Sequence, residues 1–345
     1  MNIIDYGFIP SMVSQNDTGI PARITAAYRD RFEIICEKGS GFACLKSSEY
    51  YTKNEPFPTT GDFVIIDWSK NGESRITKTL PRKTFFSRRD PSPGMGEQAV
   101  AANFDYVFIL QSLNFDFNPR RLERYLTLAW QSGAVPAVIL TKADITDNFS
   151  DQIKIAEKIA IGACVFAVSA KTGFGLDSLS EYLKPGKTIV FLGSSGVGKS
   201  SLVNALAGEE IMAVNEIRED DSKGRHTTTH RQLIMLKSGV MIIDTPGMRE
   251  LGMWDVSQGL GQSFSDVEKY LGQCKFSDCK HQSEPGCAVK AAILNGELEP
   301  DRWESYLKLK SEAKFSDDKS SYLKQKEQWH KNISKKIKNI KKNQY

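Results

Sequence analysis

Residues 193–200 read GSSGVGKS and match the phosphate-loop pattern G-x-x-x-x-G-K-[ST]. The apolar run KTIVFL precedes the loop and the helical run SSLVNALAG follows it, which is the context the pattern requires. Backbone N–H groups would surround the phosphates, Lys199 would neutralise the β and γ oxygens, and the Ser200 hydroxyl would bind Mg²⁺. The residues predicted to contact a nucleotide here are Gly193, Ser194, Ser195, Gly196, Val197, Gly198, Lys199, Ser200 and Ser201.

A second phosphate-side motif, DTPG, follows the apolar run VMIID and occupies residues 244–247. Asp244 can hold Mg²⁺ through a water molecule, and the Gly247 N–H can meet a γ-phosphate. The tetrapeptide alone is a weak signal. It gains force here because it ends an apolar strand about 45 residues after the phosphate loop.

Two short motifs, LTKAD at 140–144 and SAK at 169–171, predict which base is bound. The Asp144 carboxylate can accept from both N1–H and the exocyclic amine of guanine, and a missed charge-assisted pair costs roughly 1.5–3 kcal/mol. The Lys142 stem would lie along the base, and a backbone N–H of SAK would meet the guanine oxygen. The residues predicted to contact the base are Thr141, Lys142, Asp144, Ser169, Ala170 and Lys171.

Cys274, Cys279, His281 and Cys287 are spaced as C-x4-C-x-H-x5-C. Three thiolates and one imidazole complete a tetrahedral Zn²⁺ site with no open coordination position, so we expect one structural zinc ion per chain. The other cysteines, Cys36, Cys44 and Cys164, lie in strand-like runs and are expected in the core.

The phosphate and base motifs need a sheet that places them together. Apolar runs at 105–111, 136–141, 163–169, 187–193 and 240–244 alternate mostly with polar helical stretches. Strands that are apolar on both faces belong to a mostly parallel sheet covered by helices. We therefore expect a doubly wound α/β domain at residues 98–255.

Two further domains are expected around this one. Short strand-like runs between residues 20 and 80 favour an OB-fold β-barrel at 1–80, a fold whose open face commonly binds RNA. Tyr28, Arg29, Arg31 and Phe32 could form a stacking platform, although ordinary solvated charges on a hairpin would also explain them. Residues 81–97 are predicted to form a linker, and residues 256–345 a mostly helical zinc-binding domain.

The chain of 345 residues is 40% hydrophobic and carries a net charge of only +4. It lacks a signal-like start and any run of about 18 apolar residues, so we expect a cytoplasmic protein without a membrane segment. From Lys324 onward eight lysines accompany a single glutamate, with apolar residues at helical spacing. Such a basic helix could bind a membrane, a partner protein or RNA phosphates, and the other domains favour RNA or the ribosome.

The order of the motifs is unusual, because the base motifs precede the phosphate loop and DTPG. This order is a circular permutation. Nucleotides bind at the carboxyl ends of parallel strands, so the site depends on the positions of the strands in the sheet and not on chain order. The permutation places the segments near the γ-phosphate, 215–230 and 245–255, next to the C-terminal domain, and we expect it to transmit nucleotide state.

The domain order resembles the ribosome small-subunit-dependent GTPase A family, as do the segments FSRR, VAANFD, NPRRLERYL and GRHTTTH. The resemblance covers nearly the whole chain. It implies a cytoplasmic GTPase that binds GTP and GDP with Mg²⁺, contacts ribosomal RNA, and joins late maturation of the small ribosomal subunit, which would stimulate it. We also expect the protein to be a monomer. One departure is Thr141, which replaces the more usual asparagine of N-K-x-D and is expected to weaken guanine affinity without affecting discrimination by Asp144.

Hydrolysis needs a group that orients the attacking water. Met248 stands where many GTPases carry glutamine, so His226 in GRHTTTH is the candidate catalytic residue, with an exposed or RNA-facing histidine as the alternative. Thr228 or Thr229 is expected to reach Mg²⁺. Two other functions stay open: a GTP-gated RNA-binding placeholder with incidental hydrolysis, and a P-loop kinase, which would have no use for TKAD and SAK.

Overall fold

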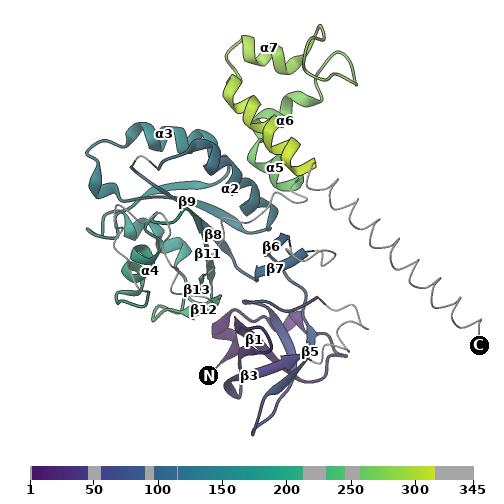
Figure 1. Ribbon diagram of the computed structural model, residues 1–345, viewed down its shortest axis with the longest axis vertical. Coiled ribbons are helices and arrows are strands. Elements are labelled where there is room, and N and C mark those ends of the chain that lie inside the picture. Colours follow the sequence, from purple (N-terminus) through teal and green to yellow (C-terminus); the bar gives the residue numbers. More distant parts are fainter. Residues whose placement is uncertain are drawn as a thin grey trace, which may run out of the picture. The chain divides into compact units, whose positions relative to one another are not determined.

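The computed structural model describes residues 2–45, 56–89, 97–114, 116–212, 231–244 and 257–314 (Figure 1). Contacts between Cα atoms divide the chain into two compact units. The first comprises residues 1–87 and 99–250, and the second comprises 88–98 and 251–345.

The first unit begins with a closed five-stranded barrel, as the sequence predicts. Its strands are β1 (Ile20–Ala27), β2 (Phe32–Cys36), β3 (Gly39–Leu45), β4 (Phe63–Asp67) and β5 (Ser74–Thr79). They follow the order β1-β2-β3-β5-β4, and β4 pairs back with β1 to close the barrel. Alternate residues of β1 point inward, so Ala22 and Ile24 are buried in the barrel core, and a register shift between Ile24 and Ala26 then interrupts the alternation.

The rest of the first unit is the expected doubly wound α/β domain. Strands β8 (Tyr106–Ser112), β9 (Val135–Thr141), β10 (Cys164–Ala167), β11 (Thr188–Gly193) and β13 (Met241–Asp244) run parallel in the order β10-β9-β8-β11-β13. The connecting helices include α2 (Pro119–Gln131), α3 (Ser150–Ile159), α4 (Lys199–Ala207) and the 3₁₀ segment η4 (Leu176–Tyr182). Phe108 packs with α4 residues, while its neighbours Val107 and Ile109 face the other way and are also buried. Both faces of the sheet are therefore covered.

A further strand, β12 (Gln232–Met235), joins the two halves of the first unit. It pairs antiparallel with β13 on one side and meets β1 of the barrel on the other, where Ala26 stands opposite Gln232. The Thr60 hydroxyl also donates to the Arg231 carbonyl at 3.2 Å. The barrel and the α/β sheet consequently form one continuous ladder of strands.

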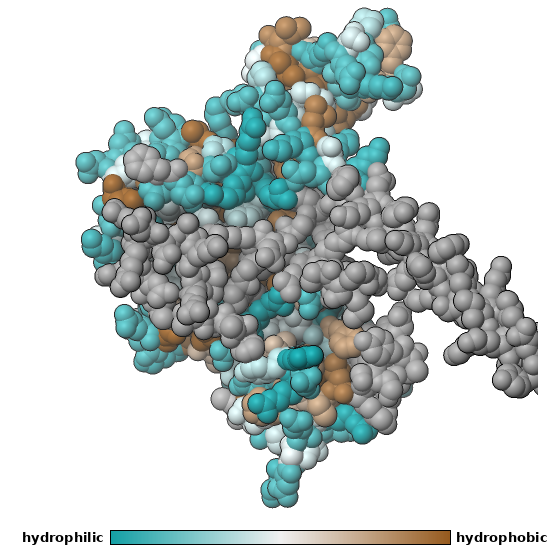
Figure 2. All heavy atoms as spheres, viewed as in Figure 1, coloured by the Kyte–Doolittle hydropathy of each residue, from teal (hydrophilic) through white to brown (hydrophobic). Residues whose placement is uncertain are grey.

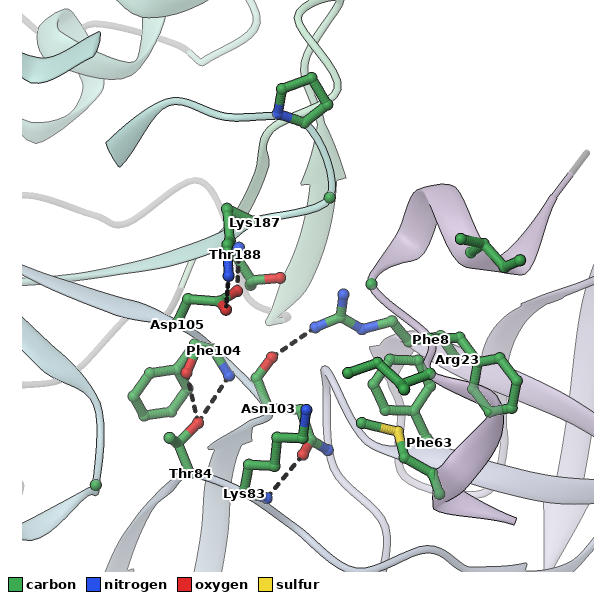
Figure 3. A pocket seen from close by; sticks show the side chains of 17 residues that line it. Phe8, Arg23, Phe63, Lys83, Thr84, Asn103, Phe104, Asp105, Lys187 and Thr188 are labelled. Carbon is green, nitrogen blue, oxygen red and sulfur yellow. Dashed lines mark hydrogen bonds and ion pairs between the residues drawn. The ribbon is translucent and has the colours of Figure 1, made fainter. Parts of the chain in front are cut away.

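Arg23 of β1 lies at this junction and is only 1% exposed. Its guanidinium donates to the Asn103 carbonyl oxygen at 2.8 Å (Figure 3). It also donates to the carbonyl oxygens of Tyr6 at 2.5 Å and Gly61 at 3.3 Å. It also contacts the sulfur of Met241 at 3.2 Å, at the start of β13. Burial lowers the pKa of Arg23 to about 10, so the charge is held in place by its backbone acceptors at a desolvation cost.

The second unit contains short helices. They are α5 (Ser257–Ser263), α6 (Ser265–Leu271), α7 (Ala288–Leu294) and a helix over residues 300–314. Arg302 connects the last helix to α5 and α6, because its guanidinium donates to the Asp266 carboxylate at 3.0 Å and to the Ser263 carbonyl at 2.5 Å. Phe264 and Tyr306 are buried and pack ring against ring, with centroids 5.6 Å apart.

Residues 81–97 contain more order than the predicted linker suggests. Strand β6 (Phe85–Arg89) pairs with β7 (Glu97–Ala102) in a separate two-stranded sheet. The predicted domain boundaries themselves stay a prediction.

Two expectations about burial are wrong. Cys36 is buried and Cys44 half-buried, but Cys164 is exposed, because β10 is the edge strand of the sheet. Phe32 is also buried, in the barrel core, so its ring cannot belong to an exposed stacking platform.

The described surface in Figure 2 is mostly hydrophilic, with hydrophobic side chains in small groups. Every helix in the described ranges is too short or too polar to cross a bilayer.

Candidate functional site

The phosphate loop connects β11, which ends at Gly193, to α4, which begins at Lys199. A Cβ atom on Gly193 would lie 3.0 Å from Val197 Cγ1 and 3.2 Å from the Leu110 carbonyl oxygen, so any larger residue would require these neighbours to move apart. Gly198 caps the helix with a φ of 99°, a conformation that favours glycine. Residues 193–201 thus form a strand, a tight turn and a helix start, the arrangement that binds phosphate.

Lys199 and Asp244 meet although 45 positions separate them in the sequence. The Lys199 ammonium donates to Asp244 Oδ1 at 2.6 Å. The contact exists because β13, which ends at Asp244, runs parallel to and beside β11. A buried carboxylate and the phosphate-loop lysine therefore lie at the same end of two neighbouring strands.

The two base motifs also converge. Strand β9 ends at Thr141, Lys142 adopts a left-handed backbone with a φ of 61°, and the 3₁₀ segment η3 (Ala143–Ile145) follows. The Ser169 hydroxyl donates to Asp144 Oδ1 at 2.6 Å. This hydrogen bond holds the pKa of Asp144 below its usual value, and the carboxylate is exposed. Asp144 is thus oriented by Ser169 and free to meet a ligand.

Thr141 links the base motif to the phosphate loop. Its hydroxyl donates to the Val197 carbonyl oxygen at 2.5 Å. A threonine at the position where asparagine is more usual can therefore still hold the two loops together. Ala170 and Lys171 follow Ser169 in the same turn, in which the Thr172 N–H donates to the Ser169 hydroxyl at 3.2 Å.

The sheet order explains how the reversed motifs form one site. The strands carrying SAK, TKAD, the phosphate loop and DTPG are β10, β9, β11 and β13, and all run parallel. Their carboxyl ends lie along one edge, where α/β sheets bind ligands. Chain order therefore does not matter for the site.

Some predicted residues lie outside the described ranges. His226, Thr228, Thr229 and Gly247 belong to residues 213–230 and 245–256, which the structure does not describe. The basic tail from Lys324 lies outside them as well.

Asp116, beside the phosphate loop, was not predicted from the sequence. Its Oδ2 accepts from the Ser194 hydroxyl at 2.6 Å, and Arg121 pairs with the same carboxylate at 2.9 Å. Arg121 also donates to the Gln111 side-chain oxygen at 3.3 Å. A short polar loop after β8 was the only sequence signal, and it does not reveal a contact with residues almost 80 positions away.

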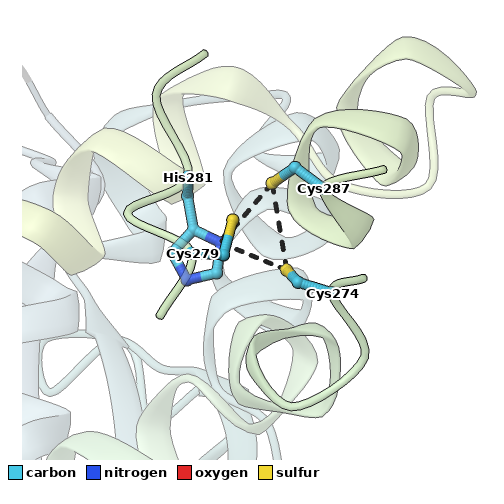
Figure 4. Close-up of side chains that lie close together, drawn as sticks. All are labelled: Cys274, Cys279, His281 and Cys287. Atoms are coloured by element: carbon cyan, nitrogen blue, oxygen red, sulfur yellow. Dashed lines mark hydrogen bonds between the residues drawn. The ribbon is translucent and has the colours of Figure 1, made fainter. Parts of the chain in front are cut away.

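The four predicted metal ligands lie together in the second unit (Figure 4). Their ligand atoms are all within 4.8 Å of one another. His281 Nδ1 lies 3.4 Å from the sulfur atoms of Cys274 and Cys287 and 3.7 Å from that of Cys279. Tetrahedral zinc with its usual bond lengths needs about 3.8 Å between sulfur atoms and about 3.5 Å between sulfur and nitrogen, so the donors fit Zn²⁺.

The surrounding residues support this cluster. Glu284 accepts hydrogen bonds from backbone N–H groups of Lys280, Gln282 and Ser283, between 2.9 and 3.0 Å. Backbone hydrogen bonds, including one from its own residue, lower the pKa of Glu284 to about 2. Trp303 packs edge-on against His281, with ring centroids 5.6 Å apart. The loop is therefore held in the ligating shape from two sides.

The barrel surface carries an arginine between two aromatic rings. Arg31 lies over Phe42, 4.2 Å from the ring centroid, and 6.0 Å from that of Tyr28. Phe42 is 37% exposed and takes the place that the sequence analysis gave to Phe32. Sequence alone missed Phe42 because it lies on β3, across the hairpin from Arg31.

Comparisons with known proteins agree with this geometry. The model of the RsgA GTPase family matches residues 79–254. A curated relative from Listeria innocua, named small ribosomal subunit biogenesis GTPase RsgA 1, is 46% identical over 319 residues, covering 92% of this chain and 90% of its own.

The chain belongs to the RsgA GTPase family. Another member, named small ribosomal subunit biogenesis GTPase RsgA, comes from Methanosarcina acetivorans. It is 43% identical over 264 residues, covering 76% of this chain and 72% of its own. The resemblance found from the sequence is confirmed.

Solved structures related to the RsgA GTPase family share the fold. The crystal structure of YjeQ from Thermotoga maritima aligns with a TM-score of 0.59 at 27% identity, covering 84% of this chain and 96% of that one. The structure of YloQ, described as a circularly permuted GTPase, aligns with a TM-score of 0.60 at 26% identity, covering 88% and 98%. The predicted permutation is confirmed.

Proposed function

We propose that this RsgA-family GTPase acts in late maturation of the small ribosomal subunit, binds that subunit and its RNA, and is stimulated by it. The observation that carries the proposal is the single sheet edge that holds Lys199 against Asp244 and Asp144 against Ser169. The names of the relatives support the biological setting. The setting implies a cytoplasmic protein, and we propose that it works as a monomer.

On the phosphate side, we assign Lys199 to the β and γ oxygens and Ser200 and Asp244 to Mg²⁺. The Asp244 carboxylate and the Ser200 hydroxyl are oxygen donors, which suit this ion. The Lys199–Asp244 pair must separate when a nucleotide enters, because the phosphates compete for the lysine. Loop N–H groups between Gly193 and Ser201 would bind the remaining phosphate oxygens.

On the base side, Asp144 would accept from both donors on the guanine edge, with Lys142 along the ring and a backbone N–H of residues 169–171 on the guanine oxygen. Two exposed apolar side chains belong to the turns that carry Asp144 and Ser169. Ile145 follows Asp144, and Phe174 accepts a backbone hydrogen bond from Ser169 at 2.9 Å; each side chain is 54% exposed. Both could pack against a planar base.

For hydrolysis, we assign His226 to the attacking water, Thr228 or Thr229 to Mg²⁺, and the Gly247 N–H to the γ-phosphate. A neutral imidazole can accept a proton or orient water, and Met248 can do neither.

The barrel and the zinc domain would help to attach the protein to the ribosomal subunit. One zinc ion on Cys274, Cys279, His281 and Cys287 would fix the fold of the second unit without taking part in hydrolysis. The Tyr28–Arg31–Phe42 cluster and the basic tail would contact ribosomal RNA by stacking and by phosphate neutralisation. We keep the domain division proposed from the sequence: barrel 1–80, linker 81–97, GTPase 98–255 and zinc domain 256–345.

The test measures GTP turnover by the full chain alone, with purified small subunits and with large subunits. Small subunits should stimulate GTP turnover by the protein, and large subunits should not. His226→Ala should keep GDP affinity and lose stimulated turnover by about a hundredfold, the usual contribution of a positioned base. His230→Ala, in the same segment, is the matched control and should retain stimulation.

Each assignment can be refuted separately. Stimulated turnover that survives His226→Ala removes His226 from the mechanism. GTP-dependent binding to small subunits without stimulation favours the placeholder function. Equal affinity for ATP and GTP would overturn the base assignment.

A further inference from the structure

A cavity of about 510 Å³ lies in the first unit, away from the nucleotide site (Figure 3). Its lining includes Asp105 and Thr188, which stand at the amino ends of β8 and β11, and Gly133, which precedes β9. The nucleotide motifs lie at the carboxyl ends of these parallel strands. The cavity and the nucleotide site are therefore at opposite edges of one sheet.

The cavity has one apolar wall. The N-terminal segment, with 3₁₀ turns η1 (Ile3–Tyr6) and η2 (Pro10–Met12), supplies most of it, and β4 of the barrel supplies Phe63. The apolar lining residues are Ile4, Phe8, Ile9, Met12, Phe63, Phe104 and Pro185. The volume lies within the range of about 300–1,000 Å³ typical of small-molecule sites.

The other wall is polar and carries more positive than negative charge. Both oxygens of Asp105 are already occupied, one by the Lys187 ammonium at 2.8 Å and the other by the Thr188 N–H at 2.9 Å. Lys83 is exposed, and among the described residues its ammonium has neither a hydrogen bond nor an ion pair. The only carboxylate in the lining is thus neutralised, while one lining ammonium is available.

Thr188 provides a second polar group without a partner. It is 1% exposed, and within the described residues its hydroxyl makes no hydrogen bond. The oxygen is closed to solvent, so a ligand in the cavity cannot reach it, and the acid group of a ligand must be recognised by Lys83.

We propose that this cavity binds a small amphipathic anion: an apolar, preferably aromatic body with one carboxylate, sulfonate or phosphate group. The body packs against the wall formed by Phe8 and Phe63, and the acid group meets the Lys83 ammonium. Occupancy is compatible with bound GDP, because the nucleotide lies at the other edge of the sheet.

The test uses 8-anilinonaphthalene-1-sulfonate as the probe, titrated by fluorescence into the full chain with saturating GDP and Mg²⁺. We expect saturable binding to one site. Lys83→Met should weaken it roughly tenfold, since a charge-assisted contact is lost. Thr188→Val should leave the affinity unchanged, because the Thr188 oxygen is closed to solvent. Lys154→Met removes an exposed lysine of α3 outside the cavity and should leave the affinity unchanged.

A matched ligand separates charge recognition from simple apolar adsorption. N-phenyl-1-naphthylamine has the same ring system without the sulfonate, and it should bind more weakly and ignore Lys83→Met. Lys83→Arg should restore sulfonate binding, which excludes misfolding as the cause of the loss. Equal sulfonate affinity in the wild type and Lys83→Met, or equal affinity for the charged and neutral probes, would overturn the proposal.

Discussion

Replacing Arg23 with methionine should destabilise the junction between the barrel and the α/β sheet. The variant removes the donor for three carbonyl oxygens, those of Tyr6, Gly61 and Asn103. A buried acceptor left without a donor costs about 1–3 kcal/mol. Part of this loss is offset, because the pKa shift of Arg23 from 12.5 to about 10 corresponds to roughly 3 kcal/mol of desolvation that methionine does not suffer. We expect a net loss of about 0–6 kcal/mol, with a central value near 3 kcal/mol.

The assay is thermal unfolding followed by circular dichroism, with hydrogen exchange to locate the change. The melting transition of the first unit should fall by about 5–15 °C. Peptides containing β1 and β13 should lose protection together, because Arg23 contacts both. Arg75→Met, at an exposed arginine of the same barrel, is the control and should stay within about 0.5 kcal/mol of the wild type. Equal shifts in the two variants would refute the reasoning.

Asp144→Asn should lower GDP affinity by about 10- to 150-fold and raise affinity for xanthosine diphosphate, whose 2-oxo group can accept from the asparagine amide; calorimetry that finds an unchanged base preference would contradict this. Asp116→Asn retains an acceptor for Ser194 but removes a negative charge beside the phosphate loop. It should strengthen GDP binding about two- to tenfold at low salt, measured with a fluorescent GDP analogue. A loss that does not depend on salt would contradict it. Cys279→Ser should lower zinc affinity by at least about 100-fold while Cys164→Ser leaves it intact, as judged by native mass spectrometry. Stoichiometric zinc in Cys279→Ser would exclude Cys279 as a ligand.

Features that depend on neighbouring residues could be predicted from the sequence. The loop at Gly193–Ser200 lies between a strand and a helix because its flanks have the matching apolar patterns. The parallel sheet followed from runs that are apolar on both faces. Asp144 and Asp244 each follow the end of a predicted parallel strand. Because parallel strands share a direction, both residues could be placed at the same edge of the sheet.

Features that depend on distant packing could not be predicted. Arg23 looks like a surface residue because arginines are rarely buried, and only the folded chain reveals its carbonyl partners. Strand β12 has four residues, too few for a clear alternation of apolar and polar positions. The contact between Asp116 and Ser194 joins two loops and leaves no periodic trace in the sequence.

The pairing of β1 with β12 limits how this protein can be dissected. A fragment starting after residue 80 would leave the backbone of β12 unpaired on its outer side, and a fragment ending there would do the same to part of β1. Bare strand edges recruit other chains and promote aggregation. Deletion experiments meant to isolate the barrel from the GTPase domain would thus yield aggregation-prone pieces, and point substitutions are the sounder way to separate their contributions.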